Sequence, residues 1–212
     1  MFAVLPSARQ WNSAKHKIKR NNRKQSNKKR ANLPLALMAI RRYKTDMAED
    51  IFDIVNERDD VVGRKPRSEV HARGLLHRAI HVMVFNSRGE VFLQKRSLKK
   101  DRQPGVWDSS CSGHVDSGED YDQTAVRELR EEIGLRLSST PEKLFKINAC
   151  AETDAEFVWV YRCQNDGPFQ LHPDEIETGR WFTPEHVSRW IKDKPQEFAP
   201  AFVFIWNKYA LL

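Results

Sequence analysis

The sequence predicts an α+β domain in which a mixed β-sheet is sandwiched between α-helices. Short apolar runs typical of strands surround one strongly periodic helix, further helical sequence follows at the end of the chain, and we find no internal repeat. Of the 212 residues, 40% are hydrophobic and 31% charged, which is typical of a globular domain rather than a membrane protein. Three cysteines are too few and too odd in number for a disulfide framework, which favours a reducing, cytoplasmic location.

The positive charge of the chain is concentrated near its N-terminus. Overall, 36 basic and 29 acidic residues give a net charge of +7, but residues 1–46 contain 13 Lys or Arg and one acidic residue. We therefore expect residues 1–46 to be a disordered basic leader and residues 47–212 to form the folded domain. Three interpretations of the leader stay open: a targeting or nucleic-acid-binding tail, an organelle transit peptide, or residues missing from the mature protein because translation starts at Met47. Without interleaved aromatic residues, it would bind nucleic acid only non-specifically.

The first part of the domain predicts two β-hairpins. Apolar runs at 51–55 and 61–62 flank the polar turn NERDD, which indicates a hairpin at the entry to the domain. Residues 64–74 are predicted to be a polar connector. Two apolar runs around the turn SRGE then predict a second hairpin over 79–97, which is followed by a basic loop at 98–105.

One helix, beginning near Tyr121, has the strongest pattern in the chain. Its apolar residues recur at helical spacing, and Gly134 lies where a C-terminal cap is expected. The later strand predictions cover residues 143–151, 156–163 and 176–183. Two further helices are expected at the end, one starting at Pro184 and one within 198–212.

Three carboxylates lie on one side of the predicted helix. Glu128, Glu131 and Glu132 stand at positions i, i+3 and i+4, while Val126, Leu129 and Ile133 are expected to face the core. Like charges at this spacing cost a helix a few tenths of a kcal/mol. Hard divalent cations such as Mg²⁺ or Mn²⁺ reverse that cost, because they bind carboxylate oxygens and bridge substrate phosphates.

Two neighbouring residues can complete this metal site. Arg127 lies beside Glu131 on the helix and can fix the orientation of its carboxylate. Gly113 permits a close backbone approach, so its carbonyl can add a further oxygen ligand. The pattern therefore predicts a divalent-metal site.

The segment GHVDSGEDYDQTAVRELREEIGL, residues 113–135, resembles the Nudix box of the Nudix hydrolase superfamily. The matching positions are Gly113, Glu119, Arg127, Glu128, Leu129, Glu131, Glu132, Gly134 and Leu135. The resemblance implies the Nudix fold and metal-assisted hydrolysis of a nucleoside diphosphate derivative or a related diphosphate.

The same resemblance implies individual roles. In that family, the residues corresponding to Glu128, Glu131 and Glu132 bind the metal. The residue corresponding to Glu119 supports the loop and sometimes contacts the metal through a water molecule, and the one corresponding to Arg127 orients the metal-binding carboxylates. The general base stays open between Glu132 and Glu175, which lies in the acidic turn HPDEIE.

Residues 50–207 also resemble a bacterial Nudix subgroup related to type I isopentenyl-diphosphate isomerase. That resemblance implies that Arg96 and Lys100 hold a diphosphate. Further positions match the metal-binding histidines and the acidic pair of the isomerase: His77, His114, Asp154 and Glu156.

Other positions depart from the isomerase. Ser112 stands where the isomerase needs a cysteine, and His71 is displaced by one residue from the position of its first histidine. We expect His77 and His81 to be packed or hydrogen-bonded rather than metal ligands. We therefore predict a metal-dependent hydrolase of a small-molecule diphosphate. The alternatives are an isopentenyl-diphosphate isomerase and a non-catalytic protein that binds RNA through its basic leader.

Overall fold

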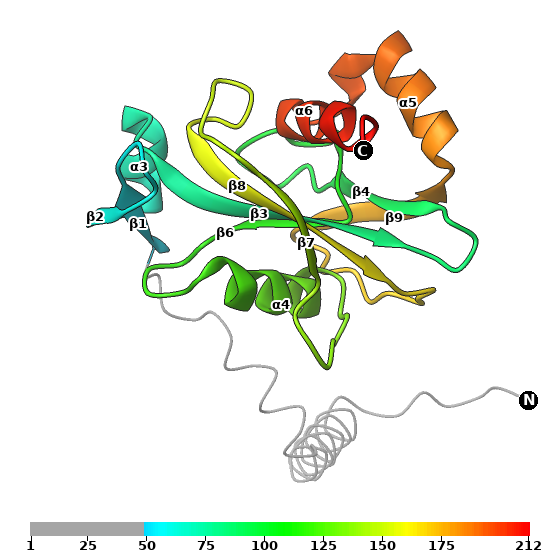
Figure 1. Cartoon of the computed structure of the whole chain (residues 1–212), viewed down its shortest axis with the longest axis horizontal. Coiled ribbons are helices and arrows are strands. Elements are labelled where there is room, and N and C mark those ends of the chain that lie inside the picture. The colour runs from blue at the N-terminus through cyan, green and yellow to red at the C-terminus, as the bar shows by residue number, and fades with distance from the viewer. Residues whose placement is uncertain (1–48) are drawn as a thin grey trace, which may run out of the picture. The chain divides into compact units, whose positions relative to one another are not determined.

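The computed structural model describes residues 49–212, which make up one unit of the chain (Figure 1). The expected leader over 1–46, its proposed binding to RNA and the boundary at Met47 all lie outside this range. Within residues 49–212, no helix has the length and apolar character needed to cross a bilayer.

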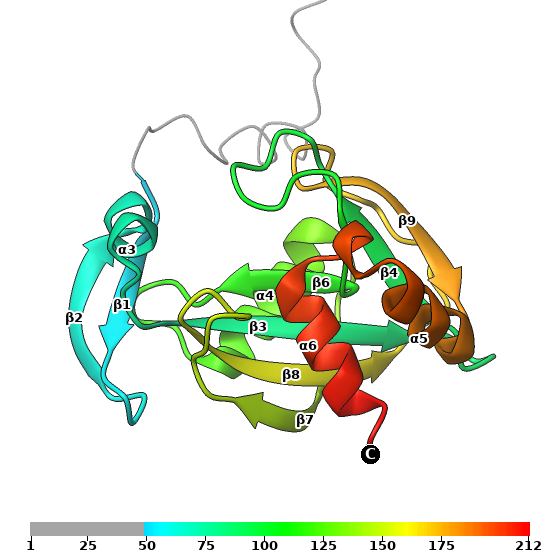
Figure 2. The same ribbon diagram turned by 90° about the horizontal axis from the view of Figure 1, so that it is seen from above.

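A mixed sheet of seven strands forms the centre of the unit, in the order β5-β4-β3-β8-β7 with β6 paired to β3 and β9 to β4. The strands are β3 (His77–Phe85), β4 (Val91–Arg96), β5 (Trp107–Asp108), β6 (Cys111–His114), β7 (Glu142–Ile147), β8 (Glu156–Gln164) and β9 (Ile176–Phe182). Helix α4 (Tyr121–Glu132) covers one face, and α5 (Pro184–Asp193) and α6 (Pro200–Tyr209) cover the other (Figures 1 and 2). The predicted sandwich of a mixed sheet between helices is confirmed.

Strand β3 pairs with three other strands. It runs parallel to β8 along its whole length and antiparallel to β6 from Ala79 to Val82. Its pairing with β4 is confined to Phe85 and Val91. The hairpin predicted over 79–97 is therefore formed only next to its turn, because β3 goes on to pair with β6 whereas β4 pairs with β5 and β9.

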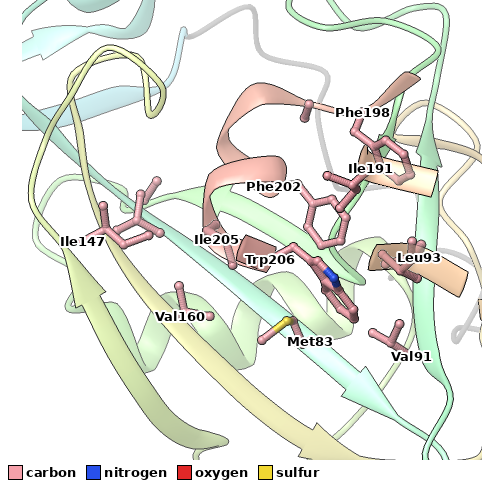
Figure 3. Packing of buried hydrophobic residues seen from close by; sticks show 14 of the residues in the cluster. Met83, Val91, Leu93, Ile147, Val160, Ile191, Phe198, Phe202, Ile205 and Trp206 are labelled. Carbon is pink, nitrogen blue, oxygen red and sulfur yellow. The ribbon is translucent and has the colours of Figure 1, made fainter. Parts of the chain in front are cut away.

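The core has two parts, one on each face of the sheet. Under α5 and α6, the indole of Trp206 and the ring of Phe202 pack against Met83 and Leu93 from the sheet (Figure 3). On the other face, Leu129 of α4 packs with Ile80, Val82 and other buried sheet residues. The prediction that Val126 faces the core is wrong, because this side chain is only half-buried. Ala125 instead occupies the buried position one turn before Leu129.

The ends of α4 follow from its sequence. The Asp120 carboxylate accepts a hydrogen bond from the backbone N–H of Gln123, and the Gln123 side chain accepts one from the N–H of Asp120, which makes a capping box. At the other end Gly134 has a φ of 71°, in the left-handed region where glycine ends helices.

Residues 64–74, predicted to be a connector, are mostly regular. Strand β1 (Ile51–Val55) pairs antiparallel with β2 (Val61–Pro66), and helix α3 (Arg67–Arg73) follows directly. The sequence pattern does not predict α3, because this helix has only seven residues and only one of them, Val70, is buried. One buried residue cannot produce the recurring apolar positions by which a helix is recognised. The run predicted as a strand over 143–151 also ends early, at Ile147.

Asp59, at the tip of the β1–β2 hairpin, attaches that hairpin to the rest of the unit. Its carboxylate receives hydrogen bonds from Arg78 at 2.6 Å and Tyr121 at 2.8 Å, and it pairs closely with Lys146. The Asp59 side chain is 8% exposed. Burial raises the pKa of Asp59, but these three hydrogen bonds outweigh burial and the pKa lies below its usual range.

Replacing Asp59 by Asn should lower the free energy of unfolding by about 2 kcal/mol at pH 7, because Arg78 and Lys146 lose their partner. Asn tolerates the positive φ of 65° at this position, so the loss reflects charge rather than backbone strain. Because the native pKa is depressed, the stabilisation is present above the usual aspartate range and lost on acidification, so the difference from wild type should shrink below about pH 4. Urea unfolding at several pH values measures it.

Asp60→Asn is the matched control, since the pair of Asp60 with Arg58 is exposed on both sides. It should cost less than about 0.5 kcal/mol. Equal losses from the two substitutions would contradict a special role for Asp59.

Candidate active site

Two of the three carboxylates of α4, those of Glu128 and Glu132, lie against strand β6. Glu132 is 5% exposed, and the side chain of Glu128 is 14% exposed. A Cβ added to Gly113 would lie 2.2 Å from Glu128 Oε1, so only glycine lets this carboxylate lie against β6. Glu131 is more open, with 41% of its side chain exposed. We call Glu128, Glu131 and Glu132 the carboxylate cluster.

Burial makes this cluster unfavourable on its own. Burial first, and then the charge of Glu132, raise the pKa of Glu128 to about 8. Burial and the charge of Glu175 raise the pKa of Glu132 to about 7, although Lys100 opposes this. Buried carboxylates that repel one another in this way fit a hard divalent cation, which prefers oxygen ligands and neutralises them.

Arg127 connects three parts of the site. Its guanidinium donates to Glu119 at 2.9–3.0 Å, to Glu128 at 2.7 Å and to the carbonyl oxygen of His114 at 3.2 Å. The contact with Glu131 is longer, at 3.4 Å. Arg127 therefore holds the loop before α4, the helix and strand β6 in one arrangement, and Glu119 is bound to it directly.

Glu132 is held between strand β6 and strand β4. Its Oε2 accepts hydrogen bonds from the backbone N–H of Ser112 on β6 at 3.2 Å and from the side chain of Gln94 on β4 at 3.3 Å. Glu132 therefore links β6 to β4, two strands that are not paired with each other.

The two basic residues predicted to bind substrate, Lys100 and Arg96, have partners of their own. Lys100 pairs with the carboxylate of Glu175, and its charge also reaches Glu132. Arg96 is 3.4 Å from Asp108 and donates to the backbone carbonyls of Arg102 and Gln103 at 3.2 Å. Arg96 thereby shapes the 98–105 loop, while Lys100 and Glu175 lie together beside Glu132.

A second group of titratable side chains lies at the other end of β6. His71 of α3, His77 of β3 and His114 of β6 each present a ring nitrogen, and these atoms lie within 4.8 Å of one another. We call these residues the histidine cluster. The ring of Phe52 stacks on His77 and His114.

Glu156 and Asp154 border the histidine cluster. Glu156 Oε1 is 3.0 Å from Nε2 of His114 and 3.5 Å from Nε2 of His77, and Asp154 is 3.4 Å from His71. Burial raises the pKa of Glu156, but the imidazoles of His114 and His77 outweigh it and lower the pKa. Burial, followed by the other two imidazoles, lowers the pKa of His71 to about 4.

The tautomer of His77 fits a cation in the histidine cluster. Its Nδ1 is 2.8 Å from the carbonyl oxygen of Leu75, which can only accept, so Nδ1 carries the proton. Its Nε2, buried and without a hydrogen-bond partner among residues 49–212, faces the Glu156 carboxylate 3.5 Å away. A ring nitrogen and a carboxylate oxygen that face each other in this way can share a proton or hold a cation between them.

Sequence reasoning discounted His71 because it is one residue out of register with the isomerase. The structure nevertheless places it in the cluster, because α3 turns its side chain toward His77 and His114. The resemblance to the isomerase had marked His77 and His114 as matches to metal-binding histidines, whereas the position of His71 beside them depends on helix α3, which the sequence pattern does not predict.

Known proteins are similar to this chain in sequence. The family model described as the NUDIX domain matches residues 75–202. An uncharacterized Nudix hydrolase of Yersinia pestis is 33% identical over 153 residues, covering 70% of this chain and 79% of that protein. An isopentenyl-diphosphate Delta-isomerase of Pectobacterium atrosepticum is 33% identical over 154 residues, covering 70% of this chain and 85% of that protein.

A solved structure is also similar. The crystal structure of a Deinococcus radiodurans protein superposes with a TM-score of 0.62 at 32% identity, covering 68% of this chain and 90% of that one.

Gly113→Ala should weaken Mg²⁺ binding by at least about tenfold, because the added Cβ displaces the Glu128 carboxylate. Mg²⁺ is the right probe since it prefers oxygen ligands to imidazole, and isothermal titration calorimetry measures its affinity. Gly63→Ala is the control, because nothing lies within 4 Å of its Cβ position. Unchanged affinity in Gly113→Ala would argue against binding at the carboxylate cluster.

Mg²⁺ affinity should rise by more than about tenfold from pH 6 to pH 8. The metal binds only deprotonated carboxylates, and the raised pKa values of Glu128, about 8, and Glu132, about 7, leave them partly protonated over this range. Binding at pH 6.5 should therefore release protons, which calorimetry in buffers of different ionisation enthalpy detects. Binding that is independent of pH would contradict the raised values.

Proposed function

The chain belongs to the Nudix family, and from that premise we propose that it is a Mg²⁺- or Mn²⁺-dependent enzyme that cleaves a diphosphate linkage in a small molecule. The Nudix domain and the relatives described as Nudix hydrolases support a hydrolase acting on acid anhydrides in phosphorus-containing substrates. The finer proposal concerns the metal, the residues and the substrate, which is a nucleoside diphosphate derivative or a related diphosphate.

One observation carries the proposal: the Glu128 carboxylate of the carboxylate cluster lies against Gly113, where any side chain would displace it. A hydrolase that positions a metal on a diphosphate needs several oxygen ligands in fixed positions. Glu128, Glu131, Glu132 and the carbonyl of Gly113 would hold the metal, and Glu119 supports them through Arg127.

Each remaining residue has a task consistent with its contacts. When bound, the metal neutralises charge on the diphosphate oxygens and lowers the pKa of water. Lys100 lies beside Glu132 and can exchange its contact with Glu175 for a phosphate oxygen. Arg96 keeps the 98–105 loop in place through its bonds to Asp108 and two loop carbonyls, from where it can reach the same substrate.

A second candidate function is the isomerisation of isopentenyl diphosphate. The histidine cluster with Glu156 favours it, because imidazole and carboxylate ligands would hold a second metal. Ser112 disfavours it, since the isomerase needs a thiol at that position and the Cys111 side chain is fully buried in the core.

Glu131→Gln should lower kcat at least about 100-fold with Mg²⁺ and a panel of nucleoside diphosphate derivatives and isopentenyl diphosphate, because one metal ligand loses its charge. Phosphate or nucleoside monophosphate release, followed by ³¹P NMR, measures the turnover. Glu185→Gln changes an exposed carboxylate in the first turn of α5 and should leave it unaltered.

Two results would contradict the proposal. Undiminished turnover in Glu131→Gln would show that the carboxylate cluster is not the active centre. Conversion of isopentenyl diphosphate to its isomer without phosphate release would establish the second candidate instead.

A further inference from the structure

Two neighbouring ion pairs join the basic loop over 98–105 to the turn before β9. Lys99 Nζ is 2.6 Å from the Asp174 carboxylate, and Lys100 pairs closely with Glu175. The side chains of the first pair are 68% and 61% exposed, whereas those of Lys100 and Glu175 are 24% and 34% exposed. The first pair is therefore a surface contact, and the second is partly enclosed by the protein.

Backbone hydrogen bonds hold Glu175 beside the end of α4. Its carbonyl oxygen accepts from the N–H of Ser97 at 2.9 Å, and its own N–H donates to the carbonyl oxygen of His172 at 3.1 Å. The N–H of His172 donates in turn to the carbonyl oxygen of Glu132 at 2.8 Å. After burial, the charges of Lys100 and then of Glu175 have the largest influence on the pKa of Glu132. The ion pair thus lies within electrostatic reach of the carboxylate cluster.

Glu132 and Glu175 differ in how well each could accept a proton from water. Glu132 is buried, accepts hydrogen bonds from Ser112 and Gln94, and belongs to the set proposed to hold the metal. Within residues 49–212, the Glu175 carboxylate receives a side-chain hydrogen bond from Lys100 alone, and about a third of it is open to solvent. Glu175 therefore becomes free to accept a proton as soon as Lys100 leaves it.

We propose that Glu175 is the proton acceptor for the attacking water and that its ion pair with Lys100 keeps it neutralised until a substrate phosphate takes Lys100 away. This role rests on the proposed hydrolysis. A diphosphate carries more negative charge than a single carboxylate, so it competes well for the Lys100 ammonium. The free enzyme then holds its base in a masked form, and the molecule to be cleaved is what releases it.

The chemical step consumes one water molecule and no other reactant. Glu175 takes a proton from water while the water oxygen forms a bond to phosphorus. The bridging P–O bond breaks, and its electron pair stays on the departing phosphate. Glu175 then returns its proton to solvent, and its ion pair with Lys100 forms again when the products leave.

Glu175→Gln tests both parts of the proposal, because the amide does not take a proton from water and no longer holds Lys100 by charge. With the full chain, Mg²⁺ and the substrate found for wild type, kcat should fall about 100-fold. The affinity for methylenediphosphonate, a diphosphate analogue that water does not cleave, should instead rise about threefold, because the partly exposed ion pair no longer competes with the probe. Isothermal titration calorimetry measures this affinity. A merely structural role would not combine slower turnover with tighter binding.

Lys100→Met separates release of the lysine from a general loss of repulsion. By itself it should weaken binding of methylenediphosphonate at least about threefold, because the probe loses a cation. In the Lys100→Met background, Glu175→Gln should no longer raise the affinity. A gain that persists in this double variant would overturn the proposal, since it would not depend on Lys100.

Asp174→Asn is the matched control, because it removes the same charge one residue away from an exposed ion pair. Its kcat and its affinity for the probe should equal those of the wild type. An equal gain in affinity in Asp174→Asn would overturn the proposal, as would a kcat within threefold of wild type, or an unchanged or lower affinity, in Glu175→Gln.

Glu131→Gln, assayed in parallel, separates this proposal from the proposed function. Loss of turnover in Glu131→Gln with full turnover in Glu175→Gln would reject the role of Glu175 and leave the hydrolase proposal standing. Absence of turnover in the wild type on every diphosphate would reject both.

Discussion

The burial of two neighbouring carboxylates against one strand is the constraint on which the rest of the site depends. Glu128 and Glu132 can lie beside β6 only because Gly113 has no side chain and because Arg127, Gln94 and the Ser112 amide give them donors. Burial weakens their tendency to ionise, which is why a bound cation would stabilise their charged forms. The fold around α4 thus contains an unfavourable charge arrangement that a divalent cation would relieve.

The sheet brings a second chemical group to the same edge. Strand β6 carries Gly113 beside the carboxylate cluster and His114 in the histidine cluster, so the two centres share a strand only four residues long. The guanidinium of Arg127 bonds to both ends of this arrangement, to Glu128 and to the backbone of His114. Relatives named as hydrolases and as isomerases both match this chain, which is consistent with one scaffold carrying both sets of ligands.

Local patterns predicted the fold class and α4, because helix period, capping and glycine position are set by nearby residues. The same spacing brought Glu128, Glu131 and Glu132 to one side of α4. For the histidine cluster, the isomerase resemblance marked His77 and His114, but local patterns could not add His71, because its place depends on α3, a helix with one buried residue, and on the tertiary pairing of β3 with β6. The short pairing between β3 and β4 could not be predicted either, because the local sequence predicts a continuous hairpin. The strand that pairs with β4 along most of its length, β9, comes from a distant part of the chain.

The pairing of β3 on both sides has a consequence for how such a protein can change over evolutionary time. His77 and His81 are four residues apart on one face of this strand, so their backbones are about 13 Å apart. Inserting a single residue between them would turn every later side chain to the opposite face and break the pairing with β6 and β8. Surface loops such as 98–105 tolerate insertions far better. An insertion between the two histidines is therefore far more disruptive to the sheet than one in a surface loop.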